Sequence, residues 1–276
     1  MAVIELLGPS HVEALKTLLA KDPVHNLYLL GLVDEFGVVC GPDRAPFAFH
    51  GRFVDGDLTA AVFVGGEGGL VIPSAGPSSA IGEIAAKLSA SVALKASLGE
   101  KALVDVLVQQ LGATVKFSKT QQLFAVSPDD LGPLTNPLLR LATEADVEQL
   151  VPLAAGCVQE TLSRNALAED PEGFPARVRQ RVKTKRTYVL EEKGRLLFKL
   201  DIGTRSSFGA EIEGLYTVPD ERHKGHASLC LGQISRFLLS SLPRLTLRVD
   251  ESNSSLAGIA RKVGYHARRL QRLVYV

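Results

Sequence analysis

One segment of the chain combines a glycine, two cations and small residues at a spacing that suits anion binding. A strand pattern ends at Pro219, and Arg222, Lys224 and Gly225 then precede an apolar helical pattern. The first turn of a helix has unpaired N–H groups and the positive end of the helix dipole, and a glycine there lets a diphosphate approach the backbone. The segment therefore predicts a diphosphate-binding loop. A tight-turn glycine before an ordinary helix is the alternative.

Two carboxylates, Glu211 and Glu213, precede this loop within the same strand pattern. Regular alternation along a strand would place them on one face together with Leu215 and Thr217. A carboxylate near such a loop could act as a general base. Both side chains could equally be solvated strand residues, and the sequence leaves that alternative open.

The elements that must position these residues fall into two halves. The 276 residues predict two domains or one large one. A stretch with three prolines, residues 127–137, is the expected linker. In the first half we expect helices at 12–19, 78–88 and 101–111, and strands at 47–54, 58–64, 70–72, 92–95 and 114–126. In the second half we expect helices at 143–153, 174–185, 226–239 and 254–262, and strands at 187–191, 195–202, 211–218, 245–249 and 265–276. This order predicts an α+β fold with a mixed sheet in each half.

The second half, residues 138–276, resembles the GNAT N-acetyltransferase superfamily. The run Tyr216-Thr217-Val218-Pro219-x-x-Arg222-x-x-Gly225-x-Ala227-Ser228 is similar to the acetyl-CoA pyrophosphate loop of that superfamily. Val249-Asp250-x-x-Asn253 and Lys262-x-Gly264-Tyr265 resemble the strand, helix and turn that complete the cofactor cleft. In the first half, the run from Asp22 to Leu32 (Asp-Pro-Val-His-Asn-Leu-Tyr-Leu-Leu-Gly-Leu) resembles a two-domain subgroup with a GNAT-like N-terminal domain.

The resemblance implies tandem GNAT-like domains, each a mixed, mostly antiparallel sheet flanked by helices. Residues 1–130 would form a degenerate GNAT-like domain, and residues 138–276 the acetyl-CoA-binding domain. Gly76-Pro77 stands where the first half would need its own pyrophosphate loop, so we expect no acyl-CoA binding there. The implied cofactor-binding residues are Leu215, Tyr216, Thr217, Arg222, His223, Lys224, Gly225, His226, Ala227, Ser228 and Asn253.

The implied activity is direct transfer of an acetyl group from acetyl-CoA to a primary amine of a small molecule or peptide. Within the superfamily, Ala210-Glu211-Ile212 matches the base-bearing strand of histone-acetyltransferase-like members, which favours Glu211 over Glu213. The position where a tyrosine often protonates the departing thiolate is Ala260, and Tyr216, Ser255 or Tyr265 could replace it. A catalytically silent acyl-CoA-binding sensor is the alternative function.

The acceptor side of the cleft is expected along residues 160–174. Glu160, Glu169 and Asp170 there could attract a cationic amine, with a solvated loop as the alternative. The sequence does not identify the amine or the role of the first domain.

Composition excludes several other classes of protein. The net charge is +1, with 46% hydrophobic and 22% charged residues, which favours a globular protein over a general binder of nucleic acid or membranes. His223, His226 and Cys230 make an incomplete ligand set, so we expect no metal. Cys40, Cys157 and Cys230 lack CxxC spacing, which is typical of a reducing compartment, and we expect a cytoplasmic protein. A homodimer is left open.

Overall fold

The computed structural model describes residues 2–38, 47–65 and 69–276. The chain forms two compact units, Met1–Leu123 with Arg268–Val276, and Phe124–Ala267. Strands β6 (Phe117–Val126) and β12 (His266–Tyr275) both cross this division. The C-terminal residues therefore belong to the first unit, which the expected linear division of the chain did not anticipate. The physical reason is an antiparallel ladder that pairs Gln271–Tyr275 with Ala96–Glu100.

The first unit is a sheet with strand order β1-β2-β3-β4-β5-β12. Adjacent strands of this sheet are antiparallel, except that β4 and β5 pair in parallel at Leu70↔Ala96 and Val71↔Ser97. Helices α3 and α4 pack their apolar faces on the sheet, and Ile81 and Leu107 belong to the same buried cluster as Val62. Its other elements are β1 (Ala2–Leu6), α1 (Val12–Leu19), α2 (Leu27–Phe36), β2 (Ala48–Val54), β3 (Asp57–Gly65), β4 (Leu70–Ala75), α3 (Ser78–Leu88), β5 (Ala96–Glu100) and α4 (Lys101–Gln110).

One expected strand of this unit is displaced along the chain. The strand predicted at 92–95 forms instead at β5, four residues later. Val92 and Leu94 pack against the core that α3 and α4 share, which accounts for their apolar alternation outside the sheet.

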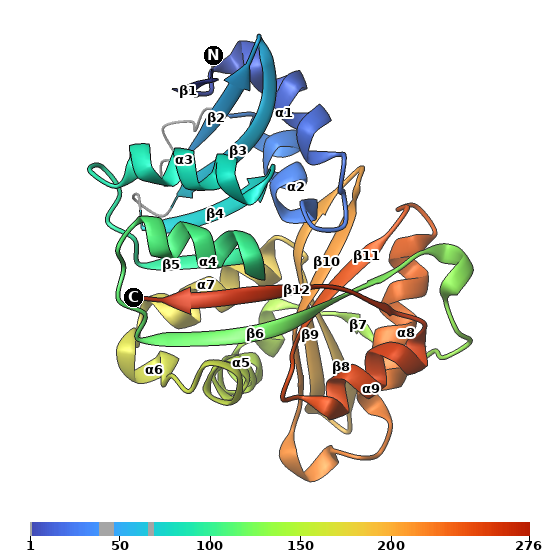
Figure 1. The fold of residues 1–276 in the computed structure, drawn as a ribbon. Helices are drawn as coiled ribbons and strands as arrows, with labels where there is room; N and C mark the ends of the chain where they lie inside the picture. The colour runs from blue at the N-terminus through green and yellow to red at the C-terminus, as the bar shows by residue number, and fades with distance from the viewer. Residues whose placement is uncertain (1, 39–46, 66–68) are drawn as a thin grey trace. The chain divides into compact units, whose positions relative to one another are not determined.

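The second unit has the strand order β11-β10-β9-β8-β7 and again contains one parallel pair, β10 with β11. Helices α8 and α9 pack on one face of this sheet, where Leu231, Ile234 and Val263 join the core with Phe198 and Leu247 (Figure 1). The elements are β7 (Arg140–Leu141), α5 (Val147–Leu162), α6 (Ala166–Glu169), α7 (Gly173–Lys183), β8 (Thr187–Glu192), β9 (Arg195–Ser206), β10 (Gly209–Thr217), α8 (His226–Leu239), β11 (Leu245–Asp250) and α9 (Ser254–Val263).

Helix α5 differs from the expected helix at 143–153. A short 3-10 turn, Glu144–Asp146, precedes it, and α5 continues to Leu162 in spite of Pro152. Glu160, expected in a loop, therefore lies in the last turns of this helix. Within the described ranges, no helix has the length and apolar character needed to cross a membrane.

Candidate functional site

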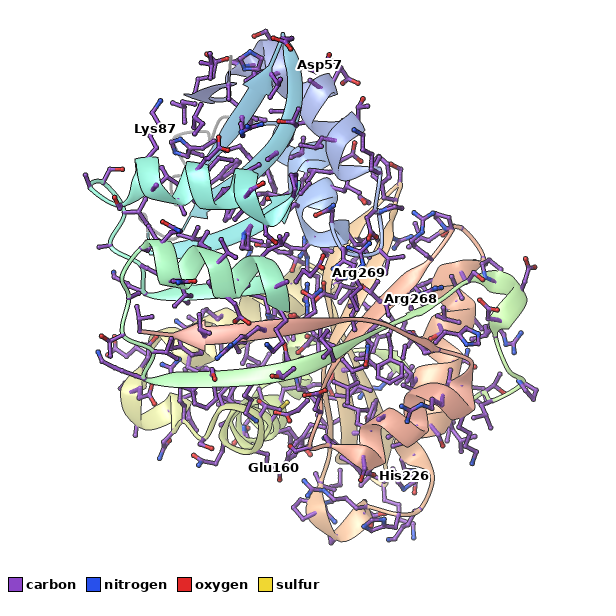
Figure 2. The ribbon with its side chains drawn as sticks, viewed as in Figure 1. Asp57, Lys87, Glu160, His226, Arg268 and Arg269 are labelled. Carbon is purple, nitrogen blue, oxygen red and sulfur yellow. The ribbon has the colours of Figure 1, made fainter. Side chains whose placement is uncertain are left out.

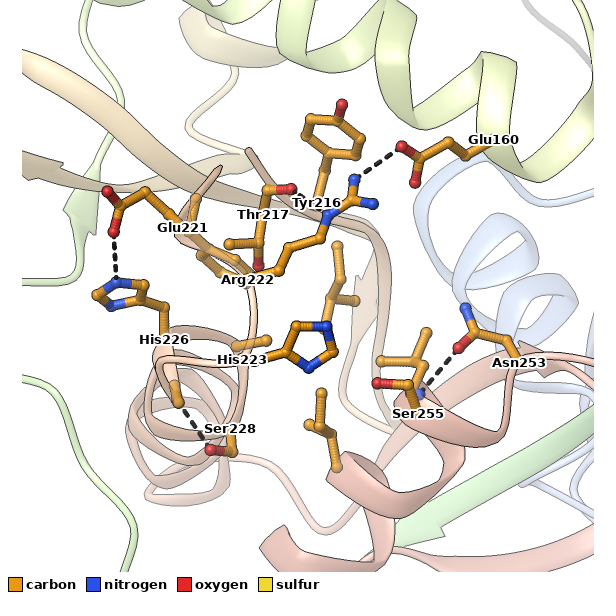
Figure 3. A pocket seen from close by; sticks show the side chains of 16 residues that line it. Glu160, Tyr216, Thr217, Glu221, Arg222, His223, His226, Ser228, Asn253 and Ser255 are labelled. Atoms are coloured by element: carbon orange, nitrogen blue, oxygen red, sulfur yellow. Dashed lines mark hydrogen bonds and ion pairs between the residues drawn. The ribbon is translucent and has the colours of Figure 1, made fainter. Parts of the chain in front are cut away.

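The second unit contains a pocket of about 480 Å³ at the carboxyl ends of β10 and β11 (Figure 3). The two strands pair in parallel over Ala210–Ile212 and Leu245–Leu247, and then continue to Thr217 and Asp250 beyond that register. Ligands of open α/β sheets bind in the crevice outside the carboxyl ends of parallel strands. The pocket is lined by Glu160, Phe198, Leu215, Tyr216, Thr217, Glu221, Arg222, His223, Gly225, His226, Ala227, Ser228, Asn253, Ser255, Leu256 and Ile259.

Most residues that the sequence assigned to the cofactor lie around this one pocket. Lys224 is the exception, since it does not line the pocket and pairs instead with Glu221, at 2.8 Å. Sequence reasoning did not single out Phe198, Leu256 or Ile259. Leu256 and Ile259 are three residues apart on α9, which is the spacing of side chains on one helix face.

A β-bulge interrupts β10 directly before the pocket. The register against β9 shifts between Glu213 and Tyr216, and Gly214 has φ +60°. A Cβ at Gly214 would lie 2.7 Å from Asp201 Oδ2 and 2.9 Å from Lys199 Nζ, so this position requires glycine in both conformation and space.

The bulge corrects the expected register of the strand. Leu215 packs against the core that contains Ile212, so these two residues share a face. In regular alternation Leu215 would have shared the face of Glu213. The extra residue thus places the glutamates and Leu215 on opposite faces, and Leu215 rather than a glutamate lines the pocket.

The loop after β10 presents the start of α8 to the pocket. A 3-10 turn, Pro219–Glu221, follows the strand, and Gly225 is the N-cap of α8 with φ +89°. A Cβ at Gly225 would meet no atom within 4 Å, so the backbone is uncovered at the position where the helix begins. Unpaired N–H groups of a helix start favour an anion at this position.

The cations of the loop are already paired with carboxylates, and Figure 3 shows the pair that Arg222 forms with Glu160. Arg222 Nη2 lies 2.7 Å from Glu160 Oε1, its Nε donates to the Thr217 carbonyl, and its guanidinium lies over the Tyr216 ring at 5.4 Å. Glu221 pairs with Lys224 and contacts His226 Nε2 at 3.3 Å, and the hydrogen bond from Lys224 lowers the pKa of Glu221. The charge of the loop is thus locally balanced, and the backbone amides are the groups directed at an anion.

The acidic residues expected to face an amine have other partners. Glu160 pairs with Arg222, Glu169 with Arg164, and Asp170 with Arg177 at 2.6 Å. Figure 2 labels Glu160, which comes from α5 and lies at the pocket wall. Sequence reasoning could not find the contact to Arg222 because it joins residues 62 positions apart.

If the pocket binds acetyl-CoA as the sequence predicts, we expect Glu160→Gln to bind it about two- to fivefold more tightly, because the change removes a negative charge from the pocket wall and frees Arg222 from its ion pair. This range corresponds to ~0.4–1 kcal/mol, which lies within the contribution of an exposed ion pair. Isothermal titration calorimetry measures it, with Glu169→Gln as the control because Glu169 pairs outside the pocket. Weaker binding by Glu160→Gln would show that Glu160 instead orients Arg222 for the ligand.

The two candidate bases differ in accessibility. Glu211 is buried, and its carboxylate pairs with the Arg248 guanidinium; burial raises its pKa, while Arg248 opposes that shift. The side chain of Glu213 is 37% exposed and accepts a hydrogen bond from Arg181 Nη1 at 2.6 Å. Neither residue is among those that line the pocket.

The candidate proton donors lie in different places, some in the pocket and one in the core. Tyr216 and Ser255 line the pocket. Tyr265 is buried in the core and shares a hydrogen bond of 2.8 Å with Ser235, and burial raises its pKa. Ala260 is fully buried in the same core. Asn253, the N-cap of α9, lines the pocket, whereas Ala260 does not.

Ala260→Tyr is expected to destabilise the second unit rather than to supply an acid. A phenol has no space at a fully buried position, and overpacking of a core costs about 1–3 kcal/mol or more. Chemical denaturation measures the loss, with the exposed Gly258→Ala as a control on the same helix. A variant of unchanged stability and increased turnover would contradict this expectation.

The three residues considered as metal ligands are not brought together. Cys230 is buried in the core, where burial raises the pKa of its thiol to about 12, whereas His223 and His226 line the pocket. In the part of the chain that the structure describes, no group of three His, Cys, Asp or Glu side chains could hold a metal ion. Cys40 lies outside the described residues.

Comparison with known proteins yields likenesses at the level of structure. No family model matches the chain, and no curated protein matches it. A GNAT-family acetyltransferase from Colwellia psychrerythraea is 13% identical, covers 99% of this chain and 100% of its own, and has a TM-score of 0.62. A Drosophila protein is 16% identical with a TM-score of 0.69, and the likeness covers 100% of this chain and 99% of that one.

A tandem GNAT protein from the clavulanic acid biosynthesis pathway is 12% identical, with a TM-score of 0.59 over 100% of this chain and 98% of its own. At these identities the likeness concerns the fold. The expected fold class is thereby confirmed: the chain shares the fold of these proteins, with a mixed sheet flanked by helices in each unit.

Proposed function

We propose that the second unit is an acetyl-CoA-dependent N-acetyltransferase that acts on a primary amine. The observation that carries the proposal is the pocket at the divergent ends of β10 and β11, where Gly225 opens the start of α8 to a ligand. The GNAT fold of the chain supports the same assignment.

The pocket offers separate surfaces for the parts of acetyl-CoA. The diphosphate would bind to the backbone amides of residues 223–228, at the positive end of the α8 dipole. The pantetheine arm would follow the strand at residues 215–217, and its apolar parts would contact Phe198 and Ile259. The thioester would then lie near the bulge at Gly214, within reach of an amine arriving from the side of Glu213.

Glu213 is the better candidate for the base in this arrangement. Its carboxylate is partly exposed, whereas the Glu211 carboxylate is buried against Arg248, and this difference supports Glu213 where the sequence favoured Glu211. Glu213 would accept the proton of the ammonium group and leave a neutral amine to attack the thioester carbon directly. Arg181 holds the Glu213 side chain in place from α7.

Tyr216 is the best-placed proton donor for the departing thiolate. It lines the pocket, and burial raises the pKa of its phenol, which keeps the group protonated near neutral pH. The two residues thus give a base and an acid on either side of the bulge. The amine itself is not selected by the fold.

A screen of free amines with acetyl-CoA, in which the released free thiol is measured, tests the proposal. The proposal would be supported if the parent chain acetylates a primary amine and the Gly225→Glu variant does not. The alternative, a silent acyl-CoA-binding sensor, predicts saturable acetyl-CoA binding with no thiol release across the screen. Absence of acetyl-CoA binding would overturn both functions.

A further inference from the structure

The first unit has a pocket of its own at the position that corresponds to the pocket of the second unit. It has a volume of about 350 Å³ and lies where β4 ends at Ala75 and β5 ends at Glu100. These strands are the parallel pair of the first unit, as β10 and β11 are of the second. All residues that line it, Arg269 of β12 included, belong to the first unit.

The lining of this pocket does not suit a diphosphate. The carboxylates of Asp22 and Glu100 border it and would repel a polyanion. Gly76 and Pro77 occupy the start of α3, and the proline contributes no N–H donor there. The two units therefore share the parallel strand pair beside a pocket, while the residues that line the two pockets differ in chemistry.

The turn between α1 and α2 supplies one wall and is held in a defined shape. Asp22 Oδ1 accepts a hydrogen bond from the His25 N–H at 3.2 Å. The buried Asn26 donates from Nδ2 to the Leu19 carbonyl at 3.1 Å. Behind the turn, His25 Nδ1 lies 2.7 Å from Nε2 of the buried Gln271. This turn is the first part of the run from Asp22 to Leu32 that the sequence singled out.

A guanidinium is fixed between the two carboxylates at the pocket. Arg269 Nη1 lies 2.8 Å from Glu100 Oε2, and Nη2 lies 3.2 Å from Asp22 Oδ2. The Arg269 side chain remains 61% exposed. A guanidinium carries five N–H donors in a planar fork that matches a carboxylate. Arg269 can therefore bind a further carboxylate group while it keeps its ion pairs with Asp22 and Glu100. Lys21 adds a second cation to the lining.

We propose that the first unit binds a small zwitterion with an ammonium and a carboxylate group, such as a free amino acid. Asp22 and Glu100 would accept the ammonium, and Arg269 with Lys21 would bind the carboxylate. Leu18 and Leu103 offer apolar contact for a side chain. Cations and carboxylates both line the pocket, so each charged group of a zwitterion would find an opposite charge there, and the volume lies within the range of small-molecule sites.

Calorimetry on the full chain with leucine tests the proposal, together with its two truncated analogues, 4-methylpentanoate and 3-methylbutylamine. The other common amino acids form a second panel. We expect at least one amino acid to bind, and each of its analogues that lacks the amine or the carboxylate to bind at least tenfold more weakly. Arg269→Met should weaken amino-acid binding by roughly ten- to a hundredfold, the effect of losing a hydrogen bond to a charged group.

Arg268→Met is the matched control, because Arg268 is the exposed neighbour on β12 and does not line the pocket (Figure 2). It should bind the amino acid as the parent chain does, and both variants should keep the parent acetyl-CoA affinity. No binding by any amino acid, equal binding of an analogue with one charge, or equal behaviour of the two arginine variants would overturn the proposal. Binding that survives Arg269→Met would place the amino acid elsewhere, for example as the acceptor in the second unit.

Discussion

Gly225→Glu is expected to abolish acetyl-CoA binding. The glutamate would cover the backbone at the N-cap of α8 and bring a negative charge to the place where the diphosphate is proposed to bind. Both effects oppose binding of the ligand, so the affinity for acetyl-CoA should fall by at least a hundredfold. Isothermal titration calorimetry should then detect no binding. The strain of φ +89° in a residue with a Cβ adds a cost to folding, so the thermal midpoint must be measured in parallel.

Two variants separate these contributions. Gly258→Glu makes the same change at an exposed position of α9, where a Cβ would meet no atom within 4 Å, and should bind acetyl-CoA normally. Gly225→Ala carries the backbone strain without the charge, and should retain part of the affinity. If the folded Gly225→Glu protein bound acetyl-CoA as well as Gly258→Glu does, the ligand would not use the start of α8.

The loop could be predicted from the sequence because its information is local. A strand, a proline, a glycine and an apolar helix follow one another within about fifteen residues, and helix-terminus physics depends on that short-range order. The structure accordingly brings Arg222, Gly225 and Ser228 to one pocket. The fold class was predictable for a similar reason, since strands and helices alternate in a recognisable order.

The rest of the site depends on contacts that no local pattern contains. The bulge at Gly214 is specified by the neighbouring strand, where Asp201 and Lys199 occupy the space that a side chain would need. The pairing of Glu160 with Arg222 joins a helix to a distant loop. Most of strand β12 belongs to the first unit because it pairs with β5. A division of the chain at one linker cannot predict that a C-terminal strand joins the N-terminal unit.

The two glutamates share a face and differ in accessibility, since Glu211 is buried against Arg248 and Glu213 is partly exposed, and this difference gives the second large effect. Glu213→Gln is expected to lower turnover by roughly 10²–10⁴-fold with acetyl-CoA affinity nearly unchanged, because a base acts on the attacking amine and not on the bound acetyl-CoA. Glutamine keeps the size of the side chain and an acceptor for Arg181, so the fold should persist. Steady-state kinetics with the best amine from the screen, together with calorimetry for acetyl-CoA, measure both quantities.

Glu211→Gln should act on stability instead. It leaves the Arg248 guanidinium without its carboxylate partner, and removal of one member of a buried pair costs about 3–5 kcal/mol. Denaturant unfolding and kinetics together should therefore distinguish the two variants. Glu213→Gln should be as stable as the parent chain but turn over slowly. Glu211→Gln should be destabilised but largely retain its turnover per folded molecule. A stable Glu211→Gln protein that loses turnover, beside an active Glu213→Gln protein, would return the role of base to Glu211. Small and equal losses in both would mean that the amine arrives already deprotonated from solution, so that no carboxylate of β10 is needed for the transfer.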